Sequence, residues 1–322
     1  MTDPAAAATA TATAAAAGPG EVALVIVTHD TREEVLGCLD ALTPDAVDQL
    51  VVVDCGSDDG TAPAVRLAAP TARVLELANA GFARGANAGI RATSAPVVVV
   101  ANADVRFPPG ALRALARTTL RTAERGAVGP RVVYPDGSLQ ASARRLPTLG
   151  TAVGHALFGR VVPANPWTRR YRALDVDPTQ AREADWLSGC VLAVRREAFE
   201  EVGGFDPGYF LYVEDVDLAS RLRAAGWRLW HDPSVEVVHR VGASTRAHRV
   251  RAVVHHARGL DRYVARHLLH GRLAPLARLV LRAALALWVV ATLAWERVAP
   301  RDVSTTGERV RRGRRALTEG RP

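Results

Sequence analysis

Residues Ala95–Val105 read APVVVVANADV, a short apolar run that ends in Asn-Ala-Asp at 102–104. Five consecutive apolar residues, entered through Pro96, predict a strand that is buried on both faces, as in a parallel sheet covered by helices. Asn102 and Asp104 then lie at the carboxyl end of this strand. Their two-residue spacing directs both side chains to one face, where they could converge on a cation or a diphosphate. Taken alone, the pattern also fits a turn or a helix cap.

The residues before this strand alternate between strand and helix patterns. Val22–Val27 is a continuous apolar run followed by the polar Thr28, and Leu50–Val53 is a second run that ends at Asp54. Apolar residues at helical spacing lie between them. This order predicts right-handed crossovers and a parallel sheet that binds ligands outside the carboxyl ends of its strands. No GxGxxG follows the first strand, which counts against a dinucleotide-binding oxidoreductase.

Two further segments combine chemistry-bearing residues with a predicted helix start. In NAGFARGANAG, at 79–89, the glycines permit close backbone approach, and Arg84 and Asn87 offer donors suited to phosphate or sugar oxygens. A glycine-rich helix start with a surface arginine is the alternative. In YFLYVEDVD, at 209–217, three acidic residues begin a helix, where carboxylates favour the helix dipole. We assign Asp217 to structure, because it can pair with Arg221 one turn later.

The motifs VIVTHD, VVVDCGSDDGT, NAGFARGANAGI and VVVVANADV resemble, in order and spacing, the nucleotide-sugar half of family 2 glycosyltransferases with the GT-A fold. Residues Asp185–Trp227 resemble the acceptor half of the rhamnosyltransferase-like members. The resemblance implies an α/β fold with a Rossmann-like, mostly parallel sheet flanked by helices. It predicts a domain at 21–245, divided into a nucleotide-sugar half at 21–128 and an acceptor half at 129–245. The implied reaction transfers a sugar from a nucleoside diphosphate to an acceptor hydroxyl, with inversion and with Mg or Mn on the diphosphate.

The resemblance also implies roles for individual residues on the donor side. The nucleoside would be held by Thr28, Asp54, Ser57 and Asp59, and the sugar diphosphate would be faced by Gly81, Phe82, Arg84, Asn87 and Asn102. Asn102 stands where the family has the first Asp of Asp-x-Asp, so Asp104 would be the only metal-binding carboxylate of this motif. His239, which follows an apolar strand, would be a further metal ligand, although a histidine there can simply be a polar strand end.

On the acceptor side, an inverting transfer needs a carboxylate that takes the proton of the attacking hydroxyl. The resemblance assigns this role to Asp215, with Glu214 orienting the acceptor and with Trp186 and Gly189 lining its site. Residues Gly129–Glu183 predict a long loop with short helices over the active site. Its arginines could meet a diphosphate on the acceptor, although surface solvation explains them nearly as well: Arg144, Arg145, Arg169, Arg170 and Arg172.

The net charge of +8 belongs to the C-terminal segment, because residues 246–322 carry 17 arginines and five acidic residues. This distribution argues against a nucleic-acid-binding protein and favours a segment that meets an anionic membrane surface. Within Leu273–Ala299, the uncharged core Ala283–Trp295 is too short to span a bilayer. A narrow polar stripe beside a broad apolar face predicts a helix lying in the membrane interface, with a dimer interface as the alternative; the stripe contains Arg278, Arg282, Thr292 and Glu296.

The remaining features concern the ends of the chain and its compartment. Residues 1–20, rich in Ala and Thr, predict a disordered tail rather than a signal peptide, and Arg309–Arg315 predicts a disordered basic tail. The three cysteines are widely spaced without a metal-binding pattern, which favours a reduced, cytoplasmic chain. We therefore expect a peripheral protein on the inner face of the cell membrane.

By resemblance, the donor is dTDP-L-rhamnose and the acceptor is a polyprenyl-diphosphate-linked or cell-wall glycan. The alternative from another class is a nucleotide-sugar-binding protein or membrane scaffold that keeps the fold without catalysis. The asparagine at position 102 favours that alternative, whereas the Glu214–Asp215 pair argues against it. A nucleotidyltransferase is disfavoured because no glycine-rich, basic triphosphate loop follows the first strand.

Overall fold

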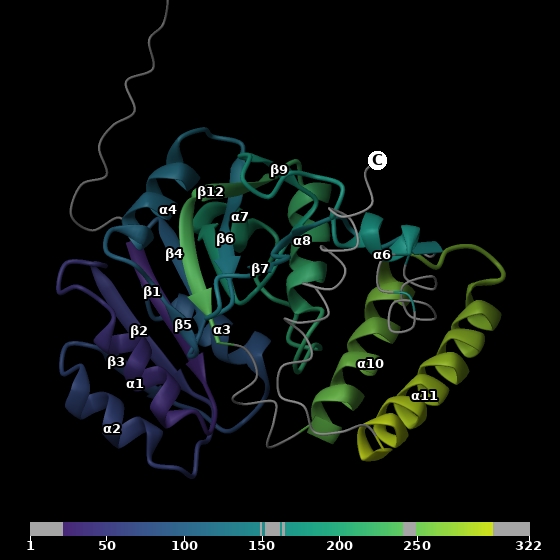
Figure 1. The fold of residues 1–322 in the computed structure, drawn as a ribbon, viewed down its shortest axis with the longest axis horizontal. Helices are drawn as coiled ribbons and strands as arrows, with labels where there is room; N and C mark the ends of the chain where they lie inside the picture. The colour runs from purple at the N-terminus through teal and green to yellow at the C-terminus, as the bar shows by residue number, and fades with distance from the viewer. Residues whose placement is uncertain (1–21, 149, 152–161, 163–164, 241–248, 299–322) are drawn as a thin grey trace, which may run out of the picture.

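The computed structural model describes residues 22–148, 150–151, 162, 165–240 and 249–298. The predicted tails at 1–20 and 309–315 lie outside these ranges. The described chain forms one large mixed sheet with helices on both faces, and a pair of long helices lies beside it (Figure 1).

The nucleotide-sugar half consists of β1 (Val22–Thr28), α1 (Arg32–Asp40), β2 (Gln49–Asp54), α2 (Thr61–Ala68), β3 (Arg73–Glu76), α3 (Phe82–Arg91), β4 (Val97–Asn102), β5 (Val105–Arg106) and α4 (Ala111–Leu120). The acceptor half consists of β6 (Arg125–Val133), β7 (Leu139–Gln140), β8 (Ala143–Arg144), α6 (Pro166–Tyr171), β9 (Arg182–Ala184), β10 (Trp186–Leu187), β11 (Val191–Arg195), α7 (Arg196–Glu201), α8 (Glu214–Ala224) and β12 (Arg228–His239). The two long helices are α10 (Arg249–His267) and α11 (Ala274–Val298).

The large sheet has the strand order β3-β2-β1-β4-β11-β6-β12-β5. The first four strands in this order are parallel, as predicted, and the register pairs Thr28 with Asp54 and Val27 with Asn102. The order reverses between β1 and β4, which is where open α/β sheets bind ligands. β11 and β5 run antiparallel to their neighbours, so the sheet is mixed.

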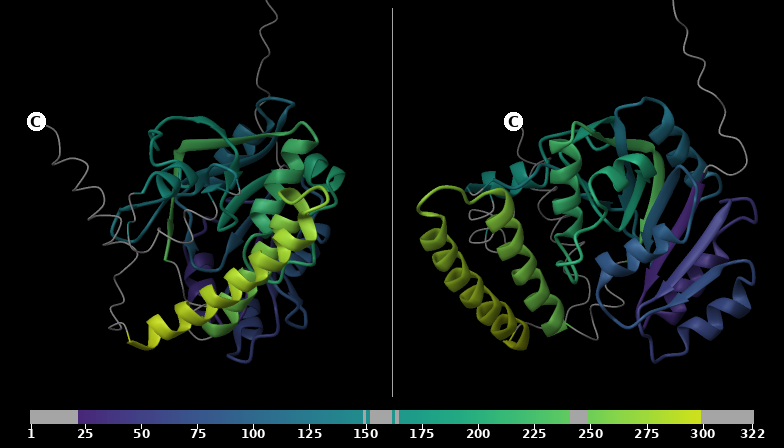
Figure 2. Two further views of the ribbon diagram at one scale, coloured as in Figure 1. Left: turned by 90° about the vertical axis from the view of Figure 1, so that its right-hand side faces the viewer. Right: turned by 180° about the vertical axis from the view of Figure 1, so that it is seen from behind.

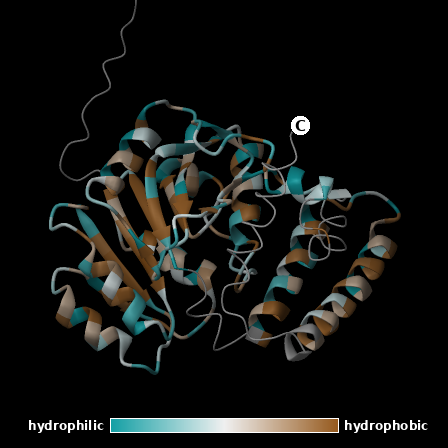
Figure 3. Ribbon diagram, in the orientation of Figure 1, coloured by the Kyte–Doolittle hydropathy of each residue, from teal (hydrophilic) through white to brown (hydrophobic). Residues whose placement is uncertain are grey.

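The hydrophobic core is divided by the sheet into two layers. Alternate strand residues point to opposite faces, so Val25 packs with the layer under α3, α7 and α8, whereas Leu24 packs with the layer under α1, α2 and α4. The central strands are the most hydrophobic part of the sheet domain (Figure 3). Burial on both faces explains why their sequences are continuous apolar runs.

The predicted loop at Gly129–Glu183 contains more regular structure than its weak periodicity indicates. Strand β6 continues through Val133, and β7 and β8 follow before α6. β8 pairs with β10 in a separate two-stranded sheet, in which Arg144 lies opposite Trp186. The prediction was therefore wrong about the start of this segment, because strands of two residues leave no readable period.

Helices α10 and α11 pack against each other, and α10 also packs against α8 (Figures 1 and 2). Two arginines of α11 bind Asp261 of α10, with Arg278 at 2.9 Å and Arg282 at 3.2 Å. Thr292 is buried. Arg278 and Arg282 of the predicted polar stripe therefore face α10 and share the Asp261 carboxylate, whereas the side chain of Glu296 lies outside the described residues.

The outer face of α11 is apolar and exposed (Figure 3), and it carries Leu276, Leu279, Val280, Leu287 and Val290. Residues Ala274–Ala294 are long and apolar enough to cross a membrane by length and composition alone. The prediction that this segment is too short to span a bilayer was therefore wrong on length, because it counted only the uncharged core, whereas the apolar stretch of the helix continues through both arginines. No other helix in the described ranges meets this criterion.

The two halves of the sheet domain meet at Gly81, just before α3. Its φ is +92°, and the Phe82 N–H donates to the Phe210 carbonyl at 2.7 Å. A Cβ atom at Gly81 would lie 2.2 Å from that same carbonyl oxygen. Only glycine fits here, because both the backbone conformation and the close approach exclude a side chain.

We expect Gly81→Ala to lower the free energy of unfolding by more than about 3 kcal/mol, since it combines backbone strain with overlap against main-chain atoms. Gly137→Ala is the matched control, because φ there is +76° and nothing lies within 4 Å of the added carbon. It should cost only about 1 kcal/mol. Denaturant titration in detergent measures both variants, and equal losses would contradict the close approach at Gly81.

Candidate functional site

The carboxyl ends of β1 and β2 form a polar shelf. Thr28 is buried and shares a 2.6 Å hydrogen bond with Thr31. Asp54 is also buried, and its Oδ1 accepts from the backbone N–H of Ser57 at 3.0 Å and from the Ser57 hydroxyl at 2.6 Å. The structure therefore brings together three of the residues predicted to hold a nucleoside.

Asp59 lies farther along the same turn, where its carboxylate joins two helices. It accepts from the Arg32 N–H at 3.0 Å and from both the N–H and the hydroxyl of Thr61. Burial opposes its charge, but these hydrogen bonds outweigh burial and lower the pKa of Asp59. Both carboxylate oxygens of Asp59 thus accept hydrogen bonds from the first turns of α1 and α2. Asp59, which was predicted to lie near the nucleoside, therefore has a structural role.

The glycine-rich segment at 79–89 mainly connects the two halves of the sheet domain. Asn87 accepts from the Phe205 N–H at 3.0 Å and donates to the Phe205 carbonyl at 2.7 Å. Phe82 makes an edge contact with the Phe205 ring, and Arg84 donates to the Pro207 carbonyl at 3.4 Å. These contacts give Phe82 and Asn87 structural roles at the interface between the two halves. Arg84, in contrast, has an exposed guanidinium.

Asp104 and His239 come from distant parts of the chain and meet at the end of β4. The Asp104 Oδ1 lies 3.1 Å from the His239 Nε2, and the Asn102 Nδ2 lies 3.4 Å from the same nitrogen. The other ring nitrogen of His239 is 2.9 Å from the Gln140 Oε1. Gln140 is a site residue that the sequence analysis missed, since β7 contains only two residues and carries no motif.

This cluster fits a divalent cation. Two adjacent ligands of a six-coordinate ion, each about 2.1 Å from the metal, are about 3 Å apart, which is close to the Asp104–His239 separation. Within the described ranges, no group of three or more His, Cys, Asp or Glu side chains could hold a metal alone. A cation would therefore take further ligands from water and from a diphosphate, as Mg²⁺ commonly does.

The surroundings of His239 favour the protonated imidazole. Burial opposes its charge, but Cys190 and the Asp104 carboxylate outweigh burial and raise the pKa of His239 to about 10. A bound metal would replace the proton on Nε2, while Gln140 would continue to accept from Nδ1. Gln140 thereby orients the imidazole, as outer hydrogen bonds commonly do at metal sites.

Asp215 lies at the start of α8, beside Gly189. Its Oδ2 accepts from the Gly189 N–H at 2.8 Å, and its Oδ1 accepts from the Val216 N–H at 2.8 Å. The backbone carbonyl of the next residue, Cys190, accepts a hydrogen bond from the Asn102 N–H at 3.0 Å. Residues 189–190 therefore connect the candidate base to the candidate metal site, which explains why Gly189 belongs to this region.

The adjacent carboxyl groups of Glu214 and Asp215 have different environments. Burial first, and then the charge of Asp215, raise the pKa of Glu214 to about 8, and its Oε2 has no hydrogen-bond partner. Burial also raises the pKa of Asp215, but two backbone N–H groups and the charge of Arg144 oppose that increase. The backbone donors and Arg144 thus favour a negative charge on Asp215 over one on Glu214, which suits a general base.

The residues around this pair position the start of α8. Tyr212 and Val213 have φ values of +69° and +71°, which is rare for side chains of this size and which sequence patterns do not reveal. One turn later, Asp217 is fully buried and binds Arg221 at 2.7 Å and His267 of α10 at 2.8 Å. The predicted structural role of Asp217 is confirmed by the Arg221 pair.

Trp186 forms an apolar wall next to Asp215. Its ring stacks on Tyr171 with centroids 5.9 Å apart, and the guanidinium of Arg144 lies 4.7 Å from the ring centroid on Trp186. The buried indole also interacts with the Asp215 carboxylate and opposes the rise in the pKa of Asp215. An apolar face beside this carboxylate is suited to a sugar, which presents both hydroxyls and C–H surfaces.

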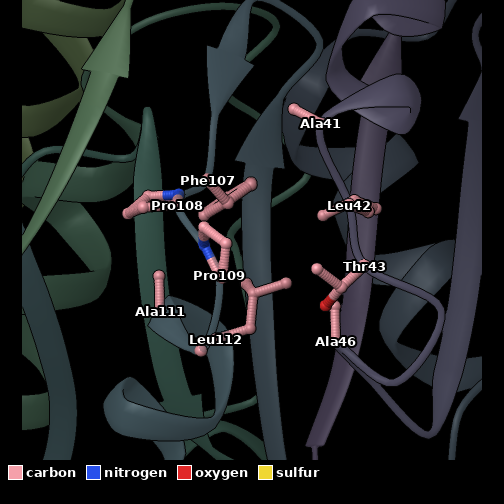
Figure 4. Close-up of a pocket in the computed structure, with 10 residues that line it drawn as sticks. Ala41, Leu42, Thr43, Ala46, Phe107, Pro108, Pro109, Ala111 and Leu112 are labelled. Carbon is pink, nitrogen blue, oxygen red and sulfur yellow. The ribbon is translucent and has the colours of Figure 1, made fainter.

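A small pocket between the loop at 41–46 and the segment 107–112 is lined almost wholly by apolar groups, with Thr43 as its one polar side chain (Figure 4). None of the residues predicted for the site lines this pocket. It offers no charge or donor cluster to a sugar diphosphate, so we do not assign the site to it.

The comparisons with known proteins agree with this arrangement. Residues 23–203 match the family model for glycosyl transferase family 2, and residues 177–256 match the model for the N-terminal domain of galactosyltransferase. The chain is similar to a solved mannosyltransferase, PcManGT from Pyrobaculum calidifontis, in complex with GDP-Man and Mn²⁺. The TM-score is 0.53 at 22% identity, over 94% of this chain and 81% of that chain. At this identity, the similarity establishes the GT-A fold.

Two curated relatives share sequence with the chain. An N-acetylglucosaminyl-diphospho-decaprenol L-rhamnosyltransferase of Mycobacterium tuberculosis is 41% identical over 208 residues, which are 61% of this chain and 67% of the relative. The rhamnosyltransferase WbbL of Escherichia coli is 40% identical over 82 residues, which are 26% of this chain and 31% of the relative.

The environment of Glu214 predicts a pH-dependent stability difference. The folded state holds the Glu214 proton up to about pH 8, whereas the unfolded chain releases it near its ordinary pKa of 4.5. Glu214 therefore lowers the free energy of unfolding progressively as the pH rises from 4.5 to about 8. Glu214→Gln should melt several degrees above the wild type near pH 8.5 and at the same temperature near pH 4. Glu200→Gln, at an exposed site, is the control, and a pH-independent difference for Glu214→Gln would contradict the assignment.

Proposed function

Because the chain belongs to family 2 of the glycosyltransferases, we propose that it transfers L-rhamnose from dTDP-L-rhamnose to a hydroxyl of a polyprenyl-diphosphate-linked glycan. The observation that carries this proposal is Asp215, a carboxylate fixed by two backbone N–H groups and joined through residues 189–190 to the Asp104–His239 cluster. A base and a diphosphate site thus lie at the same end of the sheet.

In the proposed reaction, Asp215 accepts the proton of the acceptor hydroxyl while the hydroxyl oxygen bonds to the anomeric carbon. The bond from that carbon to the diphosphate oxygen breaks on the opposite face, which inverts the configuration. Asp104 and His239 would hold a Mg²⁺ or Mn²⁺ ion, whose charge would stabilise the departing nucleoside diphosphate. Asn102 can donate to a phosphate oxygen through its amide but adds no charge.

The donor assignment is supported by residues on the shelf at β1 and β2. Thr28, Asp54 and Ser57 present hydroxyl and carboxylate groups there, as recognition of a nucleoside requires. Rhamnose as the sugar and a lipid-linked diphosphate acceptor are proposed from the names of the relatives, since two of them are rhamnosyltransferases and one acts on a decaprenol diphosphate sugar. Trp186, Gly189 and Glu214 would line the acceptor side.

The exposed face of α11 supports a membrane-associated location. Its charged residues Arg278 and Arg282 bind Asp261, so the surface that faces away from α10 is apolar. Moving such a surface from water into lipid is favourable by about 25 cal/mol per Å² buried. We place this face in the cytoplasmic leaflet, which brings the active site close to a lipid-linked acceptor.

The role of Asp215 is tested by Asp215→Asn. Losing the base should reduce turnover by about 10³-fold, while the stabilisation by dTDP-L-rhamnose with Mn²⁺ in a thermal-shift assay should remain. Asp104→Asn is the complementary variant and should abolish the metal-dependent part of that shift. If Asp215→Asn retains turnover within about tenfold, Asp215 is not the base. If no nucleotide sugar stabilises the folded wild type, the donor assignment is wrong.

The role of α11 is tested by flotation with phosphatidylglycerol-containing vesicles. Leu279→Asp combined with Leu287→Asp should reduce vesicle binding at least tenfold, because these side chains are 65% and 70% exposed on the apolar face. Leu67→Asp on α2, where the leucine is 85% exposed, is the matched control. Unchanged flotation, with loss of a dimer in sedimentation, would identify the face as a subunit interface instead.

A further inference from the structure

Two arginines of the acceptor half, Arg144 and Arg172, form no ion pair in the described ranges. Arg145, the residue after Arg144, binds Asp175 at 2.9 Å, and the charge of Arg144 acts on the candidate base Asp215. Arg144 uses its Nε to donate to the Ala141 carbonyl at 2.7 Å. The Nε of Arg172 is buried and has no hydrogen-bond partner. A buried donor without a partner is costly, so the Nε of Arg172 is suited to an anionic ligand.

The two arginines lie on either side of Tyr171. The guanidinium of Arg144 is 5.9 Å from the centroid of the Tyr171 ring, and Arg172 is the next residue in the chain. Consistent with this placement, burial and the charge of Arg144 both lower the pKa of Arg172. Two neighbouring guanidinium groups that form no ion pair in the described ranges are a suitable site for a doubly charged anion, and Arg binds phosphate groups through paired N–H donors.

The position of the pair favours the acceptor over the donor. Arg144 lies across the β8–β10 ladder from Trp186 and above its ring, and its charge reaches Asp215. The donor diphosphate, by contrast, belongs at the end of β4 with Asp104. An acceptor sugar whose hydroxyl contacts Asp215 can lie along Trp186 and direct the substituent at its own anomeric carbon toward Arg144.

The surroundings also connect the pair to the membrane-facing helices. Arg172 immediately follows α6, whose Tyr171 packs in the same hydrophobic cluster as Tyr263 of α10. In all three views, α6 lies beside the turn between α10 and α11 (Figures 1 and 2). A lipid chain attached to a diphosphate at this point would therefore have a short path to the apolar face of α11.

We propose that Arg144 and Arg172 form a binding site for the diphosphate of the lipid-linked acceptor, separate from the metal site that holds the donor diphosphate. The inference rests on the proposed function for the direction of transfer. It adds that the enzyme recognises the diphosphate linkage itself, beside the sugar that carries the attacking hydroxyl. Specificity for a lipid-linked acceptor would then arise from two charge-assisted contacts next to the base.

The test measures binding of farnesyl diphosphate to the full chain in detergent, with deoxythymidine diphosphate and Mg²⁺ present at saturation so that the donor site is filled. Each of Arg144→Gln and Arg172→Gln should weaken farnesyl diphosphate binding about 10- to 100-fold. Both should leave the affinity for deoxythymidine diphosphate within about threefold. Farnesol, which lacks the diphosphate, should bind all proteins equally.

Arg145→Gln is the matched control, because its guanidinium is paired with Asp175 at the surface. If a glutamine variant does not fold, Arg144→Lys and Arg172→Lys keep the charge and should each weaken binding about tenfold. The proposal is overturned if farnesyl diphosphate binds the glutamine variants as tightly as it binds the wild type. It is also overturned if their affinity for deoxythymidine diphosphate falls in parallel, since the pair would then serve the donor.

Acceptor assays separate this proposal from the proposed function. The wild type should use an N-acetylglucosaminyl-diphospho-lipid far better than octyl N-acetylglucosaminide. Arg144→Gln should remove most of that preference by raising KM for the diphosphate acceptor much more than KM for octyl N-acetylglucosaminide. Absence of rhamnose transfer by a wild type that binds farnesyl diphosphate through these arginines would refute the proposed function and leave the diphosphate site intact. Rhamnose transfer with equal preference for both acceptors would support the proposed function and refute the diphosphate site.

Discussion

Parallel pairing of β1 with β2 on one side and β4 on the other is the constraint on which the site depends. The register places Thr28 opposite Asp54 and Val27 opposite Asn102, so three strand ends converge although their residues are far apart in the chain. Because all three strands are buried on both faces, a shift by one residue would turn polar ends into the core. The apolar pattern that stabilises the sheet therefore also positions the donor side of the site.

The acceptor half reaches the same end of the sheet through a reversed strand. β11 runs antiparallel to β4, with Val191 opposite Ala101, so the residues just before it arrive next to Asn102. Gly189 donates to Asp215 from this position. A second connection runs through Gly81, whose contact with Phe210 holds the chain that precedes α8. Backbone contacts from both halves thus position the base. Backbone groups that the fold already fixes lose little conformational freedom on binding.

Ion pairs also organise the two long helices. Asp261 pairs with both Arg278 and Arg282, so these arginines face α10 while exposed apolar side chains cover the outer face of α11. Asp217, buried in α8, binds His267 of α10, so the helix that carries Glu214 and Asp215 is attached to the helix that supports α11. Arg144 and Arg172, in contrast, form no ion pair in the described part of the chain, and the Nε of Arg172 has no hydrogen-bond partner.

Taken by itself, the sequence determined a parallel α/β sheet, the strand ends that carry Thr28, Asp54 and Asp104, and the polar stripe of α11, because buried strands and amphipathic helices have short, readable periods. The GT-A fold followed from the resemblance of its motifs to family 2 glycosyltransferases. Only the tertiary structure decided which side chains meet. It brought Gln140 to His239, used both polar groups of Asn87 and both oxygens of Asp59 for the backbone, and placed Arg144 where its charge acts on Asp215. Contacts of this kind join residues tens of positions apart, and neither spacing nor composition records them.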